Sequence, residues 1–173
     1  MITRLGLRLT LVGLVAVTVG CDRVTKHAAS ALLAGTDGWS FLADTVRLAY
    51  VENAGGFLSL GADLPAPVRT AVFTIATGLV MVGLAAVAIR DRWTGWRAIG
   101  VTLFIAGGLS NWVDRVLRGS VIDFMNIGVG GLRTGIFNVA DVAIMIGVVV
   151  FLLAELRRPA EPPALPGASG TEP

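Results

Sequence analysis

Four aspartates occupy positions where a strongly apolar chain would be expected to carry no charge. Each lies at the end of an apolar run or in the short segment beside one, and charge in or next to hydrocarbon is costly. Such residues usually mark a working site. We expect all four to lie at one face of a membrane, where carboxyl groups can perform acid–base chemistry. The four are Asp22, Asp114, Asp123 and Asp141.

Asp123 and Asp141 are the strongest catalytic candidates because both have apolar neighbours in the sequence. Asp123 lies within the segment 121–124, and no basic residue lies within four positions of it. Burial raises the pKa of a carboxyl group, and two close carboxyl groups push their pKa values apart. One acid can then stay protonated while the other is ionised, as a general acid and a general base acting on one water require. A pair of buried acids satisfied by amide donors is the alternative, and we favour catalysis.

Asp22 and Lys26 are four residues apart, so they share one face of a helix. An acid that precedes a base at this spacing forms the favoured helical pair. We interpret the two as a structural ion pair that anchors the end of the first helix.

Two amide–carboxylate pairs repeat a spacing of three residues. Asn111 and Asp114 form one pair and Asn138 and Asp141 the other, so each amide shares a helix face with its carboxylate. Arg115 follows Asp114 and could hold a carboxylate bidentately, which would neutralise Asp114. For Asn111, Asp114 and Arg115, a functional site and a polar network that joins helices in lipid both stay open.

Composition places these residues in an integral membrane protein. The 173 residues are 54% hydrophobic, with a mean hydropathy of +0.76 and a net charge of +2. The scattered positive charges do not indicate binding to nucleic acid. A single cysteine, Cys21, excludes an intrachain disulfide and a cysteine-based metal site, and the single histidine cannot build one alone. We expect no metal.

The apolar runs predict four membrane-spanning helices, at about residues 9–33, 69–89, 98–114 and 136–156. Residues 1–156 would form one membrane domain and the proline-rich residues 157–173 a disordered cytoplasmic tail. Arginines at both ends and in the loop 90–97 place the termini in the cytoplasm by the positive-inside rule. Two longer segments then lie outside, and partial alternation over Phe41–Val51 predicts a short strand.

Five segments, in order over roughly residues 10–155, resemble lipoprotein signal peptidase, the signal peptidase II family. They are Asp22-Arg23-Val24-Thr25-Lys26, Asn53-Ala54-Gly55-Gly56-Phe57, the run from Gly107 to Arg115, Gly119-Ser120-Val121-Ile122-Asp123-Phe124, and Phe137-Asn138-Val139-Ala140-Asp141.

The resemblance implies an all-α membrane protein, a four-transmembrane-helix bundle with a small extracytoplasmic β-cradle. It implies an aspartic endopeptidase of the bacterial inner membrane, with its active site at the extracytoplasmic face. Such enzymes remove signal peptides from diacylglyceryl-modified prolipoproteins by cleaving before the lipidated cysteine. Asp123 and Asp141 match the catalytic pair, and the matching polar positions around them are Asn53, Asn111, Arg115, Asn138, Asp22, Lys26 and Asp114.

The resemblance implies neither a metal nor an organic cofactor. We expect prolipoproteins and membrane lipids as partners, no nucleic acid, and a monomer. Three other interpretations stay open. Thr18-Val19-Gly20-Cys21 resembles a lipobox, so the chain could itself be a lipoprotein precursor modified at Cys21. The acids could serve a small ion or proton carrier, or the chain could be a purely structural membrane subunit.

Overall fold

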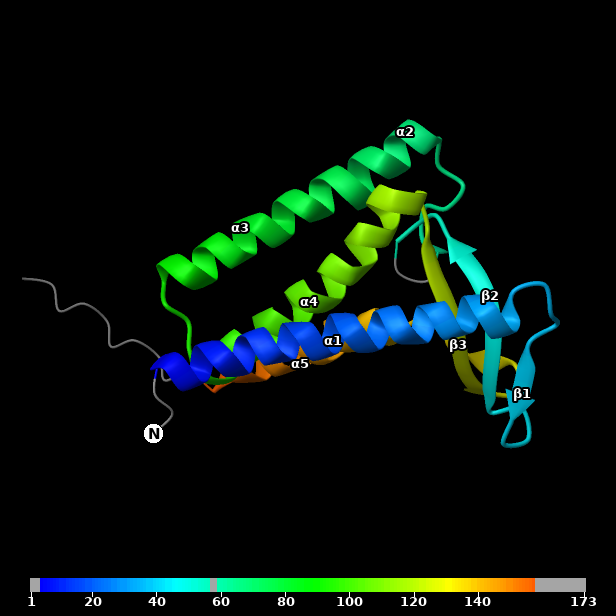
Figure 1. Ribbon diagram of the computed structural model, residues 1–173, viewed down its shortest axis with the longest axis horizontal. Coiled ribbons are helices and arrows are strands. Elements are labelled where there is room, and N and C mark those ends of the chain that lie inside the picture. The colour runs from blue at the N-terminus through cyan, green and yellow to red at the C-terminus, as the bar shows by residue number, and fades with distance from the viewer. Residues whose placement is uncertain (1–3, 57–58, 158–173) are drawn as a thin grey trace, which may run out of the picture.

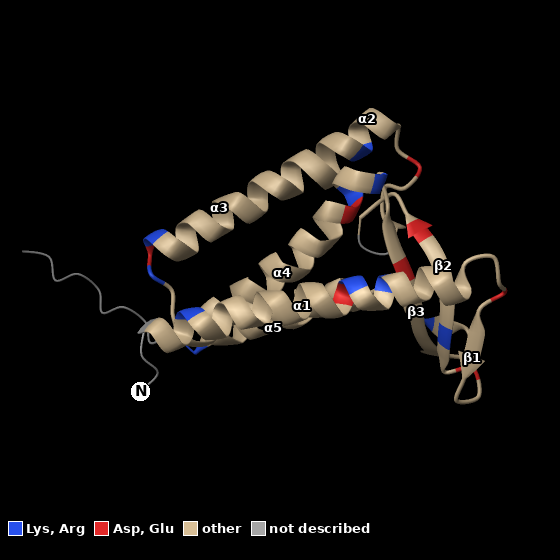
Figure 2. Ribbon diagram, viewed as in Figure 1, with Lys and Arg blue, Asp and Glu red and all other residues tan. Residues whose placement is uncertain are grey.

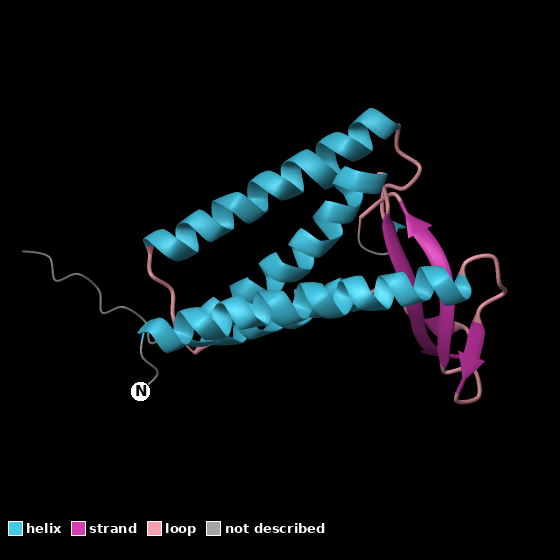
Figure 3. Cartoon of the chain, in the orientation of Figure 1, coloured by secondary structure: helices cyan, strands magenta, loops and turns pink. Residues whose placement is uncertain are grey.

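The computed structural model describes residues 4–56 and 59–157. Long helices form an elongated bundle, and a small sheet lies across one end of it (Figure 1, Figure 3). Phe57 and residues 158–173 of the predicted disordered tail lie outside the described residues. In chain order the elements are α1 (Arg4–Leu33), β1 (Trp39–Phe41), β2 (Val46–Asn53), α2 (Ala66–Arg69), the π-helical segment η2 (Thr70–Ala76), α3 (Thr77–Arg90), α4 (Gly95–Arg118), β3 (Val121–Val129), β4 (Leu132–Arg133) and α5 (Val139–Leu156).

Three helical stretches among the described residues are long and apolar enough to cross a membrane. They are Leu5–Leu33, Ala66–Arg90 and Val139–Leu156. Their apolar side chains are mostly exposed, as expected where lipid takes the place of a protein core. The chain is therefore a mostly helical, multi-pass membrane protein.

Of the four membrane-spanning helices that we predicted, α4 is the one that is not among the three stretches apolar enough to cross a membrane. It has 24 residues, but its apolar character is interrupted by buried polar side chains such as Ser110, Asn111 and Asp114. It packs against α1, α3 and α5, so these polar groups face protein and not lipid. The physical reason for its weaker hydropathy is thus its central place in the bundle.

Glycines bring α4 and α5 into close contact. A Cβ added at Gly147 would lie 2.6 Å from the Gly100 carbonyl oxygen and 2.6 Å from the Phe104 amide nitrogen. Small residues at such a crossing let two backbones approach in a way that larger side chains prevent. These glycines fix the distance between the helices that carry Asn111 and Asp141.

We expect Gly147→Ala to lower the free energy of unfolding by about 1–3 kcal/mol, because the new methyl group meets backbone atoms that cannot move aside locally. Thermal unfolding in detergent micelles, followed by circular dichroism, measures the change. Gly83→Ala is the matched control, since a Cβ there meets nothing within 4 Å. Equal unfolding temperatures for the two variants would refute this view of the α4–α5 contact.

The sheet is antiparallel and has the strand order β1-β2-β3-β4. The prediction of one strand over Phe41–Val51 was partly wrong, because β1 ends at Phe41 and a turn returns the chain into β2. That turn contains Leu42, Ala43 and Asp44, all with positive φ. Along β2 and β3, Val51 pairs with Asp123 and Asn53 with Val121. This register brings Asn53 and Asp123 to neighbouring strands.

The sheet packs on the end of α1. Ala29 and Leu33 of α1 are buried against Phe124 of β3, with Leu48 and Tyr50 of β2 beside them. The α1 helix ends where Thr36 donates both its backbone N–H and its hydroxyl group to the Leu33 carbonyl oxygen, at 3.1 and 2.9 Å. The apolar contact holds the strand that carries Asp123 against the helix end.

Candidate active site

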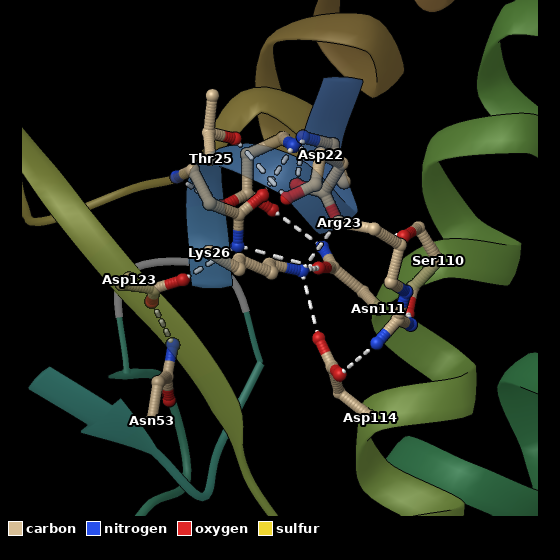
Figure 4. A network of polar contacts seen from close by, with 12 residues as sticks. Asp22, Arg23, Thr25, Lys26, Asn53, Ser110, Asn111, Asp114 and Asp123 are labelled. Atoms are coloured by element: carbon tan, nitrogen blue, oxygen red, sulfur yellow. Dashed lines mark hydrogen bonds and ion pairs between the residues drawn. The ribbon is translucent and has the colours of Figure 1, made fainter. Parts of the chain in front are cut away.

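A buried polar network lies where α1, α4 and α5 meet the sheet. Figure 2 marks charged residues on the ribbon of α1 beyond its middle and near the end of α4, on the side of the bundle toward the sheet. Figure 4 shows that side chains from α1, α4, β2 and β3 converge on one region. The network contains all four aspartates that the sequence singled out, together with Lys26, Asn53, Ser110, Asn111 and Asn138.

Lys26 lies at the centre of the ion pairs. Its Nζ lies 2.7 Å from Asp22 Oδ2 and 2.8 Å from Asp114 Oδ2, and it donates to Asn111 Oδ1 at 2.7 Å. The ion pair predicted between Asp22 and Lys26 is present, and Asp114 extends it to α4. The exposed fractions of the Lys26, Asp22 and Asp114 side chains are 3%, 0% and 1%. Such charges are tolerated in a helix bundle only when they are paired.

Asp22 also joins α1 to α4 and α5. Ser110 Oγ donates to Asp22 Oδ2 at 2.6 Å, and the Ala140 backbone N–H donates to Asp22 Oδ1 at 2.9 Å. Ala140 lies in the first turn of α5, where backbone N–H groups have no partner within the helix. The carboxylate therefore satisfies a helix end and faces its positive dipole, which agrees with the structural interpretation of Asp22.

Arg23 is a residue of this network that the sequence reasoning missed. Its guanidinium donates to Asp114 Oδ1 at 2.5 Å and to the Ser110 carbonyl oxygen at 2.6 Å. The expectation that Arg115 would neutralise Asp114 was wrong, because Arg23 and Lys26 hold that carboxylate. The spacing of three between Arg23 and Lys26, on one helix face, was the available signal.

Arg115 instead connects α4 to the segment after β2. Its Nη2 donates to the Gly55 carbonyl oxygen at 2.7 Å, and its guanidinium carbon lies 6.0 Å from the centre of the Phe73 ring. In the same segment, Asn53 Oδ1 accepts the Gly55 N–H at 2.9 Å. Arg115 and Asn53 thus both fix the chain that follows the strand.

Asn138 contacts both candidate catalytic aspartates. Its Nδ2 donates to Asp123 Oδ1 at 2.6 Å, while its Oδ1 accepts the Asp141 backbone N–H at 2.9 Å. One side-chain amide therefore lies between a residue of β3 and a residue of α5. The two aspartates, 18 positions apart in the chain, share this neighbour.

Each of the two carboxylates accepts a further amide hydrogen bond. Asn53 Nδ2 donates to Asp123 Oδ2 at 2.9 Å, and Asn111 Nδ2 donates to Asp141 Oδ1 at 2.9 Å. Asn111 Oδ1 also accepts from Asn138 Nδ2, at 3.2 Å. Neutral amide donors from three asparagines thus orient the two carboxylates.

Asp141 has a second, structural relation to Asn138. We expected the last helix from about residue 136, but α5 begins at Val139 with Asn138 as its N-cap, so Asp141 lies in the first turn. Asp141 Oδ2 accepts the Asn138 backbone N–H at 3.1 Å, which completes a capping box. The spacing of three residues between Asn138 and Asp141 is therefore the spacing of a capping box, and it also brings both residues into the candidate site.

The Asp123 side chain lies on the sheet, outside the helical spans, and is only 3% exposed. Burial raises the pKa of Asp123 from its ordinary value of 3.8 to about 6. Hydrogen bonds from Asn53 and Asn138 oppose this rise, and the negative charge of Asp141 adds to it. Around neutral pH this acid can thus take up or release a proton, as acid–base catalysis requires.

The raised pKa of Asp123 predicts a pH-dependent stability. Between about pH 4 and pH 6 the folded state keeps a proton that the unfolded chain has lost, so this group stabilises less as the pH rises. We therefore expect the free energy of unfolding of the wild type, minus that of Asp123→Asn, to decrease as the pH rises from about 4 to about 6. Unfolding at a series of pH values measures the difference, with Asp37→Asn, an exposed loop position, as control. A difference independent of pH would contradict the raised pKa.

Among residues 4–56 and 59–157, no group of three or more His, Cys, Asp and Glu side chains is arranged to hold a metal ion. The carboxylates of Asp123 and Asp141 accept hydrogen bonds from asparagine side-chain amides and from the Asn138 backbone N–H.

The apolar helices, the small sheet and the buried aspartates at one end of the bundle define a polytopic membrane protein with an acidic site. The chain belongs to the signal peptidase II family, whose model, described as Signal peptidase (SPase) II, matches residues 14–157. This family assignment makes the chain a membrane peptidase.

Individual relatives agree with the family assignment. The chain is 30% identical over 145 residues to a lipoprotein signal peptidase of Streptococcus pneumoniae, covering 83% of this chain and 90% of that protein. It is 28% identical over 137 residues to one of Staphylococcus aureus, covering 79% and 81%. Two solved structures of bacterial membrane enzymes match with a TM-score of 0.75 and 27% identity, over 86% of this chain and 88% and 93% of theirs.

Proposed function

We propose that this chain is an aspartic endopeptidase that removes signal peptides from diacylglyceryl-modified prolipoproteins by cleaving before the lipidated cysteine. The observation that carries the proposal is the amide of Asn138, which contacts Asp123 and Asp141 together in a buried polar network. The relatives from Streptococcus and Staphylococcus bear the name lipoprotein signal peptidase, which supplies the substrate class.

In the proposed topology α4 also crosses the membrane, as the third of four spans in chain order, and both termini are cytoplasmic. The basic loop between α3 and α4 lies at the end of the bundle far from the sheet (Figure 2), as the positive-inside rule favours for a cytoplasmic end. The network and the sheet would then lie at the extracytoplasmic face of a bacterial inner membrane. The proposed enzyme acts as a monomer.

In the proposed mechanism the two carboxyl groups divide acid and base work. The ionised member of the pair removes a proton from water, which attacks the scissile carbonyl carbon. The protonated member donates to the carbonyl oxygen, and a proton later reaches the leaving amine. The pair titrates jointly, so the roles belong to the pair. Asn53, Asn111 and Asn138 hold the carboxylates at the peptide, and Lys26, Asp22, Asp114 and Arg115 hold the elements that carry them.

Two other interpretations are less well supported. A carrier usually binds its ion near the midplane of the bilayer, whereas Asp123 lies on strand β3 and Asp141 lies in the first turn of α5, whose N-cap Asn138 is hydrogen-bonded to Asp123. A lipoprotein precursor would lose residues 1–20, yet α1 is helical without interruption from Arg4 through Cys21 to Leu33. Asp22, the next residue, is fully buried and bound to α5.

Processing of a defined precursor tests the proposed function. Purified protein in detergent micelles is incubated with a diacylglyceryl-modified precursor and, separately, with the same precursor without lipid. We expect mass spectrometry to show a product that begins at the lipidated cysteine, from the first substrate only. A variant with both Asp123→Asn and Asp141→Asn excludes a contaminating protease. Cleavage at another bond, equal cleavage of the unmodified precursor, or activity of the double variant would refute the proposal.

A further inference from the structure

A second feature lies at the opposite end of the bundle from the aspartates. A cavity of about 680 Å³ opens between α1, α3 and α4. Small side chains of α3, including Ala85 and Ala88, form one wall, and Leu11 and Ile105 lie on the other side. Arg8, Arg92 and Trp93 line its polar end. None of these residues takes part in the network around Asp123 and Asp141.

A second cavity continues the first along α1 and α4. It has a volume of about 410 Å³, shares Leu11, Thr102 and Ile105 with the first, and reaches Ala16. From Arg8 to Ala16 a helix rises about 12 Å. That length is close to half of a hydrocarbon core of about 30 Å. The two cavities together form an apolar trough, defined by these residues, that spans roughly one leaflet.

At the polar end of the trough, two arginines form no ion pair with any carboxylate in the part of the chain that the structure describes. Within the described residues, Arg8 and Arg92 are exposed and form no ion pair, whereas their neighbours Arg90 and Arg97 pair with Asp91 and Glu155. Trp93 stacks on the Phe151 ring with centroids 5.5 Å apart and is only partly buried. An amphipathic indole beside arginines is typical of the level of lipid headgroups.

We propose that the trough binds one anionic phospholipid. Arg8 and Arg92 bind the headgroup phosphate, and an acyl chain lies against Leu11 and Ile105 between α1 and α4. Basic pockets between membrane helices recognise anionic headgroups in this way. The start of a signal peptide is a poorer occupant, because its positively charged n-region meets two free arginines. The inference does not depend on the peptidase reaction.

Lipid competition measured by native mass spectrometry tests this site. The full chain is purified in micelles that contain equal amounts of phosphatidylglycerol and phosphatidylethanolamine with the same acyl chains. We expect the wild type to retain one phosphatidylglycerol preferentially. Arg8→Gln with Arg92→Gln removes two charges, each worth roughly a fivefold preference, so the selectivity is expected to fall at least fivefold. Arg90→Gln, at the same end but paired with Asp91, is the matched control.

Three results would overturn the proposal. The first is a wild type without headgroup preference, and the second is a loss of preference in Arg90→Gln equal to that in the double variant. The third is a double variant that retains phosphatidylglycerol but has a raised KM for a lipidated precursor, which would make the trough a substrate site. Circular dichroism of each variant shows that a change in lipid retention is not unfolding. Lipid retention by mass is independent of whether the chain cleaves any peptide.

Discussion

Replacing either Asp123 or Asp141 by asparagine is expected to lower kcat for precursor cleavage by about 10²- to 10⁴-fold. Each substitution keeps the size of the side chain and removes its ability to exchange a proton, and a positioned acid or base supplies rate enhancement of this order. Both carboxylates are already oriented by amide donors, so the loss should appear in kcat more than in KM. Initial rates on a diacylglyceryl-modified precursor measure it.

The helix-capping role of Asp141 requires a control of its own. A capping box accepts Gln at the position that Asp141 occupies. Asp141→Gln should therefore keep the start of α5 while abolishing acid–base exchange, and Asp37→Asn should leave both unchanged. If Asp141→Gln cleaved the precursor at the wild-type rate, Asp141 would be a capping residue only and the twin-acid mechanism would be wrong.

Lys26→Met is expected to produce the largest loss of stability, about 3–5 kcal/mol of unfolding free energy. The substitution leaves Asp22 deeply buried without a cation and leaves Asp114 with Arg23 alone. Removing one partner of a buried ion pair has this magnitude because the remaining charge stays out of water. Unfolding in detergent micelles, followed by circular dichroism, gives the value.

Two comparisons test the cause of that loss. Arg90→Met breaks an exposed pair with Asp91 and should change stability by less than about 1 kcal/mol. Adding Asp22→Asn and Asp114→Asn to Lys26→Met removes the stranded charges, so part of the stability should return. Equal losses for Lys26→Met and Arg90→Met would show that the buried network does not hold the helices together.

The sequence predicted the apolar helices well because each is a long run of apolar residues with charges at its ends. It predicted β2 less well and gave no indication of β3 as a strand. The first four residues of β3 are all buried, so the alternation that marks a half-exposed strand is absent there. The helix α4 buries polar residues against the other helices of the bundle. These residues lower its hydropathy, so a search for apolar runs is less able to identify it as a membrane span.

Among the site residues, the sequence identified those whose type was unusual for their surroundings. Asp22, Asp123 and Asp141 stood out as acids beside apolar segments, and the structure brings them into one network. Contacts between residues that are far apart in the sequence could not be predicted in the same way. Arg23 and Asp114 are 91 positions apart, and the nearer Arg115 was the wrong choice. The capping box at Asn138 was readable, since an Asn three residues before an acid precedes an apolar run.

The relative position of the two candidate catalytic acids depends on whether the first turn of α5 is folded. Asn138 both begins this helix and lies between the two acids, so fraying of a single turn would part Asp141 from Asp123 while the rest of the bundle stays intact. The integrity of the proposed peptidase thus depends on a unit of only a few residues. Asp22 of the neighbouring helix α1, held by Lys26, accepts a hydrogen bond from the Ala140 amide in this turn. Charged residues far away in the sequence therefore stabilise the start of α5.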